Sequence, residues 1–330
     1  MKDAYICSAL VDMYCKCGFL EEAHGLLDQL PSRDIISWTA LISGYTDLGL
    51  CEEAYICFEE MQQEGVYPDV VVWNSMILSY AEVDCEKALK LYGQLQEQGV
   101  LPDSRIFVST LKACGDAVAL ETGKKFHSMI NRIISETSEV VLTNALVDMY
   151  GRCGSLDFAC KVFEASGEKD VVTWSTFIAG LVQHDCGEEA LSHFEKMQQE
   201  GIEPNHVTFL CILKACSIMS ALSYGKLIQA SIIKHGLESN ERIGSALVDM
   251  YSKCGSIEDA LSEFHRMPMR DVVAWNAMIE AYIEHLLCDE ALTLFQQMQL
   301  EGVRPDTYTY VSVLDACAKK GDLNEGKKIH

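Results

Sequence analysis

Cysteine is the residue type in this chain best suited to chemistry, with fifteen copies in 330 residues. Such a density suits a disulfide framework or metal sites when the spacing fits either arrangement. No CxxC occurs, and the closest pair is Cys15 with Cys17. Six cysteines instead return in two periodic series, Cys17, Cys153 and Cys254 in the first and Cys114, Cys216 and Cys317 in the second. This favours small, buried, reduced side chains in helix packing, and a reducing compartment.

Histidine offers little that could act in catalysis. A zinc deaminase needs HxE followed by PCxxC. The chain has HxE at His193-Phe194-Glu195, with no PCxxC after it, so we interpret it as a chance occurrence within a helix. His127 and His330 end GKKFH and GKKIH, where packing or surface exposure is expected. We predict that this stretch is not catalytic, and that it binds no metal, cofactor or small-molecule substrate.

The elements that position these residues follow a fixed period. Intervals of 35, 101 and 101 residues separate the four tryptophans, which are Trp38, Trp73, Trp174 and Trp275. The string ALVDMY keeps the same register and begins at Ala9, Ala145 and Ala246. Two independent markers in one register indicate a stacked-repeat solenoid.

Each repeat reads as a helical hairpin. Residues 35–69 hold two apolar series with the i, i+3, i+4, i+7 spacing of a helix, Trp38, Leu41, Ile42 and Tyr45, then Ala54, Cys57, Phe58 and Met61. Gly49 and Gly65 end the two helices, each about 12 residues or roughly 18 Å long. Neither helix buries its apolar face alone, so stacked hairpins must form the core.

The whole chain divides in this way into nine complete repeats and a partial one. Their ranges are 4–34, 35–69, 70–103, 104–139, 140–170, 171–205, 206–240, 241–271, 272–306 and 307–330. We therefore expect one elongated all-α array over residues 1–330. Because the chain enters the array almost at once, with no targeting segment, and stops partway through a repeat, we interpret it as a fragment. No apolar run approaches 18 residues, so no membrane span is predicted.

The overall charge is strongly acidic, at a formal −23. This argues against a protein that grips nucleic acid through a bulk positive field, although a local groove remains compatible with RNA.

The repeats resemble pentatricopeptide repeats of the plant class in which standard, long and short forms alternate. DVVTWSTFIAGLVQH with EEALSHFEKMQQEGIEPN resembles the standard form, TNALVDMYGRCGSLDFACKVF the short form, and TFLCILKACSIMSALSYGKLI the long form. The resemblance covers practically all of the chain. It implies a right-handed α-solenoid superhelix of stacked helix-turn-helix hairpins that binds single-stranded RNA.

The resemblance also implies that the fifth residue and the last residue of a repeat together read one base. The fifth residue lies about 100° around the helix from the buried tryptophan position, so it should leave the core for a neighbouring face. In standard and short repeats it is always small and polar: Ser8, Thr39, Asn74, Asn144, Ser175, Ser245 and Asn276. The matching last residues are Asp34, Asp69, Asp103, Asp170, Asn205, Asp271 and Asp306, which could equally serve as helix caps.

The long repeats carry apolar fifth residues, Val108, Leu210 and Val311, and are expected to space or stack rather than discriminate. The family's pairing rule assigns G to Ser or Thr with Asp, U to Asn with Asp, and A to Ser with Asn. The implied target, read 5′ to 3′, is GGUNUANGU.

The thirteenth residue of each short repeat is basic, and the resemblance implies that it contacts phosphate: Lys16, Arg152 and Lys253. A solvated surface cation is the alternative. With only three such groups, the slope of log affinity against log salt concentration should be about −2 on single-stranded RNA.

The leading functional hypothesis is sequence-specific binding of single-stranded organellar RNA in RNA processing, as site recognition for C-to-U editing. Editing-factor proteins are expected as further partners, and the mitochondrion is favoured over the chloroplast. Two alternatives stay open. The intact polypeptide could carry a C-terminal cytidine-deaminase-like domain, or the acidic solenoid could be a scaffold that holds a basic peptide.

Overall fold

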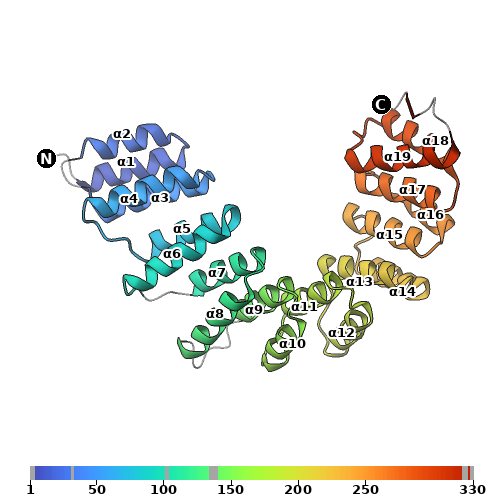
Figure 1. The fold of residues 1–330 in the computed structure, drawn as a ribbon, viewed down its shortest axis with the longest axis horizontal. Helices are drawn as coiled ribbons and strands as arrows, with labels where there is room; N and C mark the ends of the chain where they lie inside the picture. Colours follow the sequence, from blue (N-terminus) through green and yellow to red (C-terminus); the bar gives the residue numbers. More distant parts are fainter. Residues whose placement is uncertain (1–3, 31–32, 101–103, 134–139, 322–325, 328–330) are drawn as a thin grey trace. The chain divides into compact units, whose positions relative to one another are not determined.

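The computed structural model describes residues 4–30, 33–100, 104–133, 140–321 and 326–327. Within these ranges the named secondary-structure elements are 19 α-helices, so the fold is all-α as predicted (Figure 1). They are α1 (Ala4–Lys16), α2 (Leu20–Asp28), α3 (Ile35–Asp47), α4 (Cys51–Gln63), α5 (Val70–Val83), α6 (Cys85–Glu97), α7 (Ser104–Asp116), α8 (Leu120–Ile133), α9 (Val140–Arg152), α10 (Leu156–Ala165), α11 (Val171–Gln183), α12 (Gly187–Gln199), α13 (His206–Met219), α14 (Leu222–Lys234), α15 (Glu241–Lys253), α16 (Ile257–Arg266), α17 (Val272–Glu284), α18 (Cys288–Leu300) and α19 (Thr307–Lys320).

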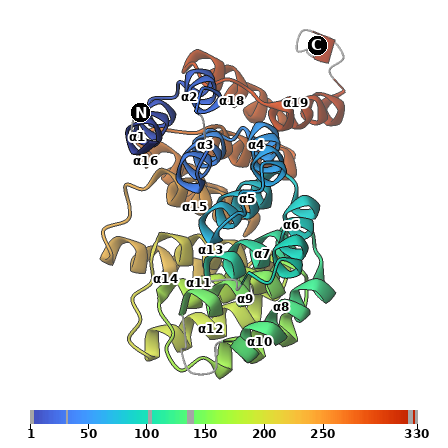
Figure 2. The ribbon, with the colours of Figure 1, turned by 90° about the vertical axis from the view of Figure 1, so that its left-hand side faces the viewer.

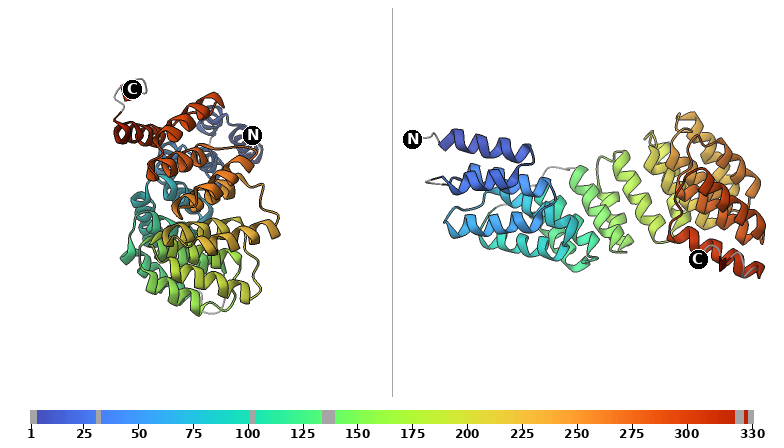
Figure 3. Two further views of the ribbon diagram at one scale, coloured as in Figure 1. Left: turned by 90° about the vertical axis from the view of Figure 1, so that its right-hand side faces the viewer. Right: turned by 90° about the horizontal axis from the view of Figure 1, so that it is seen from above.

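The helices form two compact halves, residues 1–168 and 169–330. In the N-terminal half the odd-numbered helices α1, α3, α5, α7 and α9 pack in a row (Figure 2). The helices α2, α4, α6 and α8 each pack on the odd-numbered helix before them and on the one after them, and α10 packs on α9. In the C-terminal half α11, α13, α15, α17 and α19 repeat this arrangement (Figure 3). Each half is therefore a stack of helical hairpins with its core between the two helix layers.

The start of most odd-numbered helices is fixed by the side chain that precedes it. Asp34 accepts a hydrogen bond from Ser37 N at 2.9 Å, Asn205 from Thr208 N at 3.0 Å and Asp271 from Ala274 N at 2.9 Å. Such N-caps contribute about 1 kcal/mol each to helix stability. Gly65 and Gly302 follow α4 and α18 with φ of +79° each, a conformation that favours glycine.

The core is built on the periodic aromatic residues. All four tryptophans are buried, with exposures of 0 or 1%. Trp73 meets Phe58 of the preceding hairpin edge-to-face at a centroid distance of 5.0 Å, and Trp275 meets Phe264 in the same way at 4.8 Å. At these two positions the tryptophan marks a contact that joins one hairpin to the next.

The cysteines whose side chains are described are free thiols. Cys114, Cys216 and Cys317 are buried, as predicted for that series. The other series departs from the prediction, because Cys153 and Cys254 are only partly buried and Cys17 is exposed. Cys153 and Cys254 lie against the backbone carbonyls of Cys114 and Cys216 on the preceding long hairpins. Cys17 follows the last residue of α1, and its thiol contacts Met13 of that helix.

Among the described helices, none has both the length and the apolar content needed to cross a bilayer.

Candidate nucleic-acid interface

The predicted base-reading residues lie on the odd-numbered helices, at the edge between neighbouring hairpins. The sequence predicts that the fifth residue of a repeat leaves the core. Four of the seven polar fifth residues are instead almost completely buried. Ser8, Ser175, Ser245 and Asn276 are only 3–7% exposed. Thr39, Asn74 and Asn144 are half-buried. The cause is the following hairpin, whose capping residues cover the fifth side chain.

Three of the predicted pairs are in direct contact. Asn276 Nδ2 donates to Asp306 Oδ1 at 3.1 Å, and Ser245 Oγ donates to Asp271 Oδ1 at 2.9 Å. Ser8 Oγ lies 3.5 Å from Asp34 Oδ1, at the outer limit for a hydrogen bond. In these three repeats the capping residue of the following helix thus also orients the fifth residue of its own repeat.

A fourth pair is joined through one more hydroxyl. Ser175 Oγ lies 2.7 Å from Thr208 Oγ1, which in turn lies 3.1 Å from Asn205 Oδ1. Ser175 also donates to the carbonyl of Val171 at 2.6 Å. Its position is therefore fixed from two sides.

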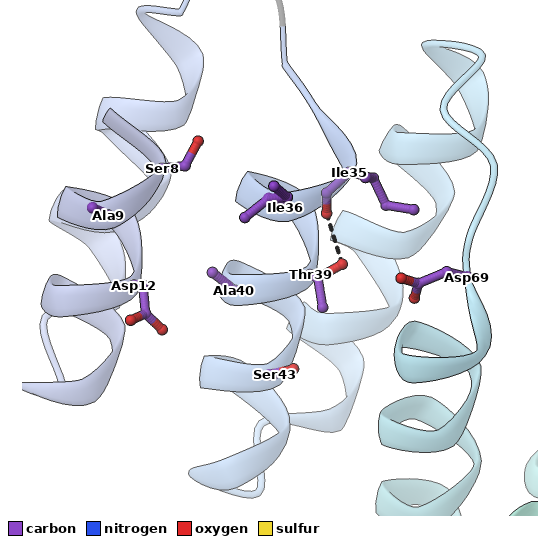
Figure 4. A pocket seen from close by; sticks show the side chains of 9 residues that line it. All are labelled: Ser8, Ala9, Asp12, Ile35, Ile36, Thr39, Ala40, Ser43 and Asp69. Carbon is purple, nitrogen blue, oxygen red and sulfur yellow. Dashed lines mark hydrogen bonds between the residues drawn. The ribbon is translucent and has the colours of Figure 1, made fainter. Parts of the chain in front are cut away.

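Thr39 and Asp69 meet at an open pocket of about 490 Å³. Figure 4 shows Asp69, at the start of α5, directed toward the side of α3 that carries Thr39. The Thr39 hydroxyl donates to the carbonyl of Ile35 at 2.6 Å. The lining is Ser8, Ala9, Asp12, Ile35, Ile36, Thr39, Ala40, Ser43 and Asp69. The volume falls within the range of small-ligand pockets, roughly 300–1,000 Å³.

The remaining predicted positions are Asp103, Asn144, Asp170 and the fifth residues of the long repeats. Asp103, the predicted partner of Asn74, lies outside the described residues. Asn144 Oδ1 is buried without a hydrogen-bond partner among the described residues. Asp170 caps α11 by accepting from Thr173 N at 2.8 Å. Of the apolar fifth residues in the long repeats, Val108 and Leu210 are half-buried and Val311 is exposed.

Two of the capping carboxylates titrate below their usual range. Burial alone would raise the pKa of Asp34, but hydrogen bonds from Ser37 and Ser8 outweigh it and lower that pKa. The pKa of Asp306 is lowered by hydrogen bonds from the backbone and side chain of Thr309, with a further contribution from Asn276. Both groups are therefore ionised near neutral pH and act only as hydrogen-bond acceptors.

A row of exposed aliphatic residues accompanies the polar pairs and was not identified from the sequence. It consists of the second residue of six repeats, each 40–62% exposed: Ile36, Val71, Val141, Val172, Val207 and Val273. Side chains of this type are usually buried, and apolar groups in contact with a flat ring provide a surface for a nucleobase. The signal in the sequence is the aliphatic residue two places before each tryptophan or its equivalent.

The three predicted phosphate contacts are each held by an aspartate four residues earlier. Lys16 pairs with Asp12 at 2.8 Å, Arg152 with Asp148 at 2.8 Å, and Lys253 with Asp249 at 2.9 Å. Arg152 also pairs with Asp116. These cations are accessible, but their charge is compensated within the same helix.

The histidines of the HxE and GKKFH motifs take part in helix packing. His193 Nδ1 contacts the carbonyl of Glu189 at 2.8 Å, and its ring meets Phe177 edge-to-face. His127 Nδ1 lies 2.9 Å from Tyr150 Oη, and burial lowers the pKa of His127. His330 lies outside the described residues. No cluster of three or more metal-ligating side chains occurs among the residues that the structure describes.

Sequence comparisons place these repeats in a known class. The profile of the PPR repeat family matches residues 33–82, 169–217 and 270–319, and the PPR repeat profile matches residues 5–35, 141–171 and 245–272. Together the matched segments cover more than half of the chain.

Curated relatives from Arabidopsis thaliana agree. A pentatricopeptide repeat-containing protein is 38% identical over 97% of this chain and 39% of its own length. A mitochondrial pentatricopeptide repeat-containing protein is 32% identical over 99% of this chain and 52% of its own length, and a chloroplastic one is 34% identical over 98% and 47%. The chain thus spans about half or less of the length of these relatives.

Solved structures show the same fold. The crystal structure of the pentatricopeptide repeat protein PPR10 from maize superposes with a TM-score of 0.70 at 21% identity, over 99% of this chain and 53% of that one. PPR10 in complex with an 18-nt psaJ RNA element superposes with a TM-score of 0.52 at 18% identity, over 100% of this chain and 53% of that one.

Proposed function

This chain belongs to the pentatricopeptide repeat family, and from that membership we propose that it binds single-stranded RNA in a sequence-specific manner. Each standard or short repeat reads one base through its fifth and last residues. The observation that carries the proposal is the direct contact between these residues, as in Asn276 with Asp306 and Ser245 with Asp271. PPR10, which shares the fold, has been solved with an RNA element.

The hydrogen-bond inventory of each pair supports a specific base. In Ser245 with Asp271, the single hydroxyl proton is already committed, so the pair presents acceptors only. Guanine offers two adjacent donors on its Watson–Crick edge and is the best complement. In Asn276 with Asp306, the amide keeps a second N–H donor and a free lone pair on Oδ1. One donor beside one acceptor matches uracil.

The pair Ser175 with Asn205 differs by one group. Asn205 replaces the acidic partner with an amide, which adds donors to the acceptor of the serine. Adenine, with an amino donor beside a ring acceptor, complements that arrangement. The exposed aliphatic second residues, such as Val172 and Val207, supply apolar surface on either side of the base.

The order of the repeats gives the address GGUNUANGU, in which N marks the long repeats. A selection from a random RNA pool tests the proposal. We expect a GGUNUANGU-like consensus, and we expect the Asn276→Ala variant to lose preference at the last position alone. A pool that stays flat would contradict RNA reading and favour the peptide scaffold.

We place this activity in organelle RNA processing, at a site selected for C-to-U editing. The support is that two of the relatives are named as mitochondrial and chloroplastic proteins. The polypeptides of the relatives extend well beyond the matched region, which leaves room for a domain that performs the reaction. Sequencing of organellar transcripts from plants that lack this protein would show one unedited cytidine near the address.

Removing the aspartate that holds a phosphate-contact cation should strengthen RNA binding. In Asp249→Asn, Lys253 loses its 2.9 Å ion pair and becomes free to neutralise one phosphate. We expect affinity to rise about threefold, and the slope of log affinity against log salt to steepen by about 0.7. Titration of labelled RNA at several salt concentrations measures both quantities.

Glu258→Gln is the matched control. It removes the same charge from α16, an even-numbered helix away from the row of odd-numbered helices. Its salt slope should equal that of the wild type. An Asp249→Asn slope equal to the control would mean that Lys253 makes no phosphate contact.

A further inference from the structure

Three buried hydroxyl groups stand between consecutive repeats and contact the base-reading side chains. Ser37, Thr208 and Thr309 are each the third residue of their repeat and are 0% exposed. Each contacts the fifth residue of the repeat before it. Ser37 Oγ lies 2.8 Å from Ser8 Oγ, Thr208 Oγ1 lies 2.7 Å from Ser175 Oγ, and Thr309 Oγ1 donates to Asn276 Oδ1 at 2.6 Å.

The same hydroxyls also contact the last residue of that preceding repeat. Ser37 Oγ lies 2.7 Å from Asp34 Oδ1, Thr208 Oγ1 lies 3.1 Å from Asn205 Oδ1, and Thr309 Oγ1 lies 2.9 Å from Asp306 Oδ1. Each hydroxyl therefore touches both members of one base-reading pair. Two of the three, Thr208 and Thr309, belong to long repeats, whose own fifth residues are apolar.

The contact fixes the orientation of the Asn276 amide. Asp306 only accepts hydrogen bonds, so the amide must turn its Nδ2 toward that carboxylate. The Thr309 hydroxyl meets the other end of the amide, Oδ1. With both ends held, one N–H and one lone pair of Asn276 remain for a base, in a fixed plane.

Where the third residue of the next repeat is apolar, it offers the fifth residue no hydroxyl contact. Ala274 follows the Ser245 repeat, and there Ser245 donates directly to Asp271 Oδ1 at 2.9 Å. Val72 follows the Thr39 repeat, and Thr39 donates back to the Ile35 carbonyl at 2.6 Å. Ser175, which does contact Thr208, also donates to the carbonyl four residues earlier, so the hydroxyl of the next repeat is an additional contact and does not replace the others.

We propose that Thr309, and likewise Ser37 and Thr208, are positioning residues that set the base preference of the repeat preceding their own. This rests on the proposed RNA-reading function. It gives the long repeats a part in recognition that their own fifth residues do not supply. It also means that a repeat is read together with the third residue of its successor.

The test uses Thr309→Val, which removes the hydroxyl at nearly constant volume, and Thr309→Ser, which retains it. Affinities are measured for four RNAs that differ only at the base assigned to Asn276. We expect Thr309→Val to reduce the preference for uracil about fivefold, the value of one net hydrogen bond. Thr309→Ser should restore it. Ala274→Thr tests the converse, and we expect the preference for guanine at the Ser245 position to shift by a similar factor.

Thr309 also caps α19 by exchanging hydrogen bonds with Asp306, so the melting temperature of each variant is measured alongside. An equal loss of affinity for all four RNAs would show a purely structural role and overturn the inference. So would an unchanged preference. Wild-type protein with no preference among the four RNAs would overturn the proposed function and this inference with it. A preserved wild-type preference with an insensitive Thr309→Val would overturn this inference alone.

Discussion

Exchanging Asn276 for serine should move the base preference of its repeat from uracil to guanine. The change replaces an amide, which offers one donor and one acceptor, with a hydroxyl whose proton is taken by Asp306. The Ser245 pair shows that geometry, with its hydroxyl donating to Asp271 at 2.9 Å. We expect the ratio of affinities for the U-containing and G-containing RNAs to change roughly 10- to 100-fold, by analogy with direct base readout. Competition binding with RNAs that differ at that one position measures the ratio.

The reciprocal variant, Ser245→Asn, is the matched control because it swaps the same two side chains in the adjacent repeat. It should move its own position from guanine to uracil and leave the Asn276 position unchanged. The double variant should exchange the two preferences. Asn144→Thr should likewise move its position from uracil toward guanine. Single variants that weaken binding to every RNA equally would contradict the pairing rule.

The hairpins were predictable because their signals are local. The apolar spacing of residues 35–69, the aspartate or asparagine before most odd-numbered helices and the glycines with positive φ all act within a few residues of the chain. The tryptophan period predicted correctly which side chains are most buried. The ion pair between Lys253 and Asp249 could also have been predicted, since the two residues lie four positions apart on one helix.

The burial of the fifth residues was not predictable in the same way. Helical spacing shows how Ser175 lies relative to the apolar face of its own helix, but not what the next repeat places over it. Thr208, 33 residues later, covers it. Close approaches between repeats have the same origin. A Cβ at Gly225 would come within 2.5 Å of Met250 Sδ, which the glycine in the sequence does not reveal. Contacts of this kind depend on the register between neighbouring repeats.

Replacing Trp275 with alanine should destabilise the C-terminal half more than any other single change considered. Trp275 is 0% exposed and packs edge-to-face on Phe264 of the preceding repeat. Removal of a buried tryptophan costs about 3–5 kcal/mol of unfolding free energy. In an array whose repeats contact only their neighbours, the loss should also uncouple residues 272–306 from residues 241–271. Denaturant unfolding followed by circular dichroism should then change from one transition to two.

Trp275→Phe separates the lost volume from the lost aromatic contact. The Trp275 Nε1 group has no hydrogen-bond partner among the described residues, so phenylalanine gives up no hydrogen bond and keeps a ring against Phe264. It should cost less than half as much as alanine. A cost equal to that of alanine would mean that the indole volume, rather than the ring contact, joins the two repeats.

Val273→Ala provides the opposite control on the same helix. Val273 is 54% exposed, so its truncation should change the unfolding free energy by no more than about 0.5 kcal/mol. If its side chain lies against a base, RNA affinity should nevertheless fall. We expect a loss of about threefold, because two methyl groups that the base only partly covers are removed. Two residues that are two places apart would then divide the roles of the helix, with Trp275 holding the array together and Val273 binding RNA. A loss of stability in Val273→Ala would give Val273 a role in packing. Full RNA affinity in that variant would mean that this side chain makes no contact with RNA.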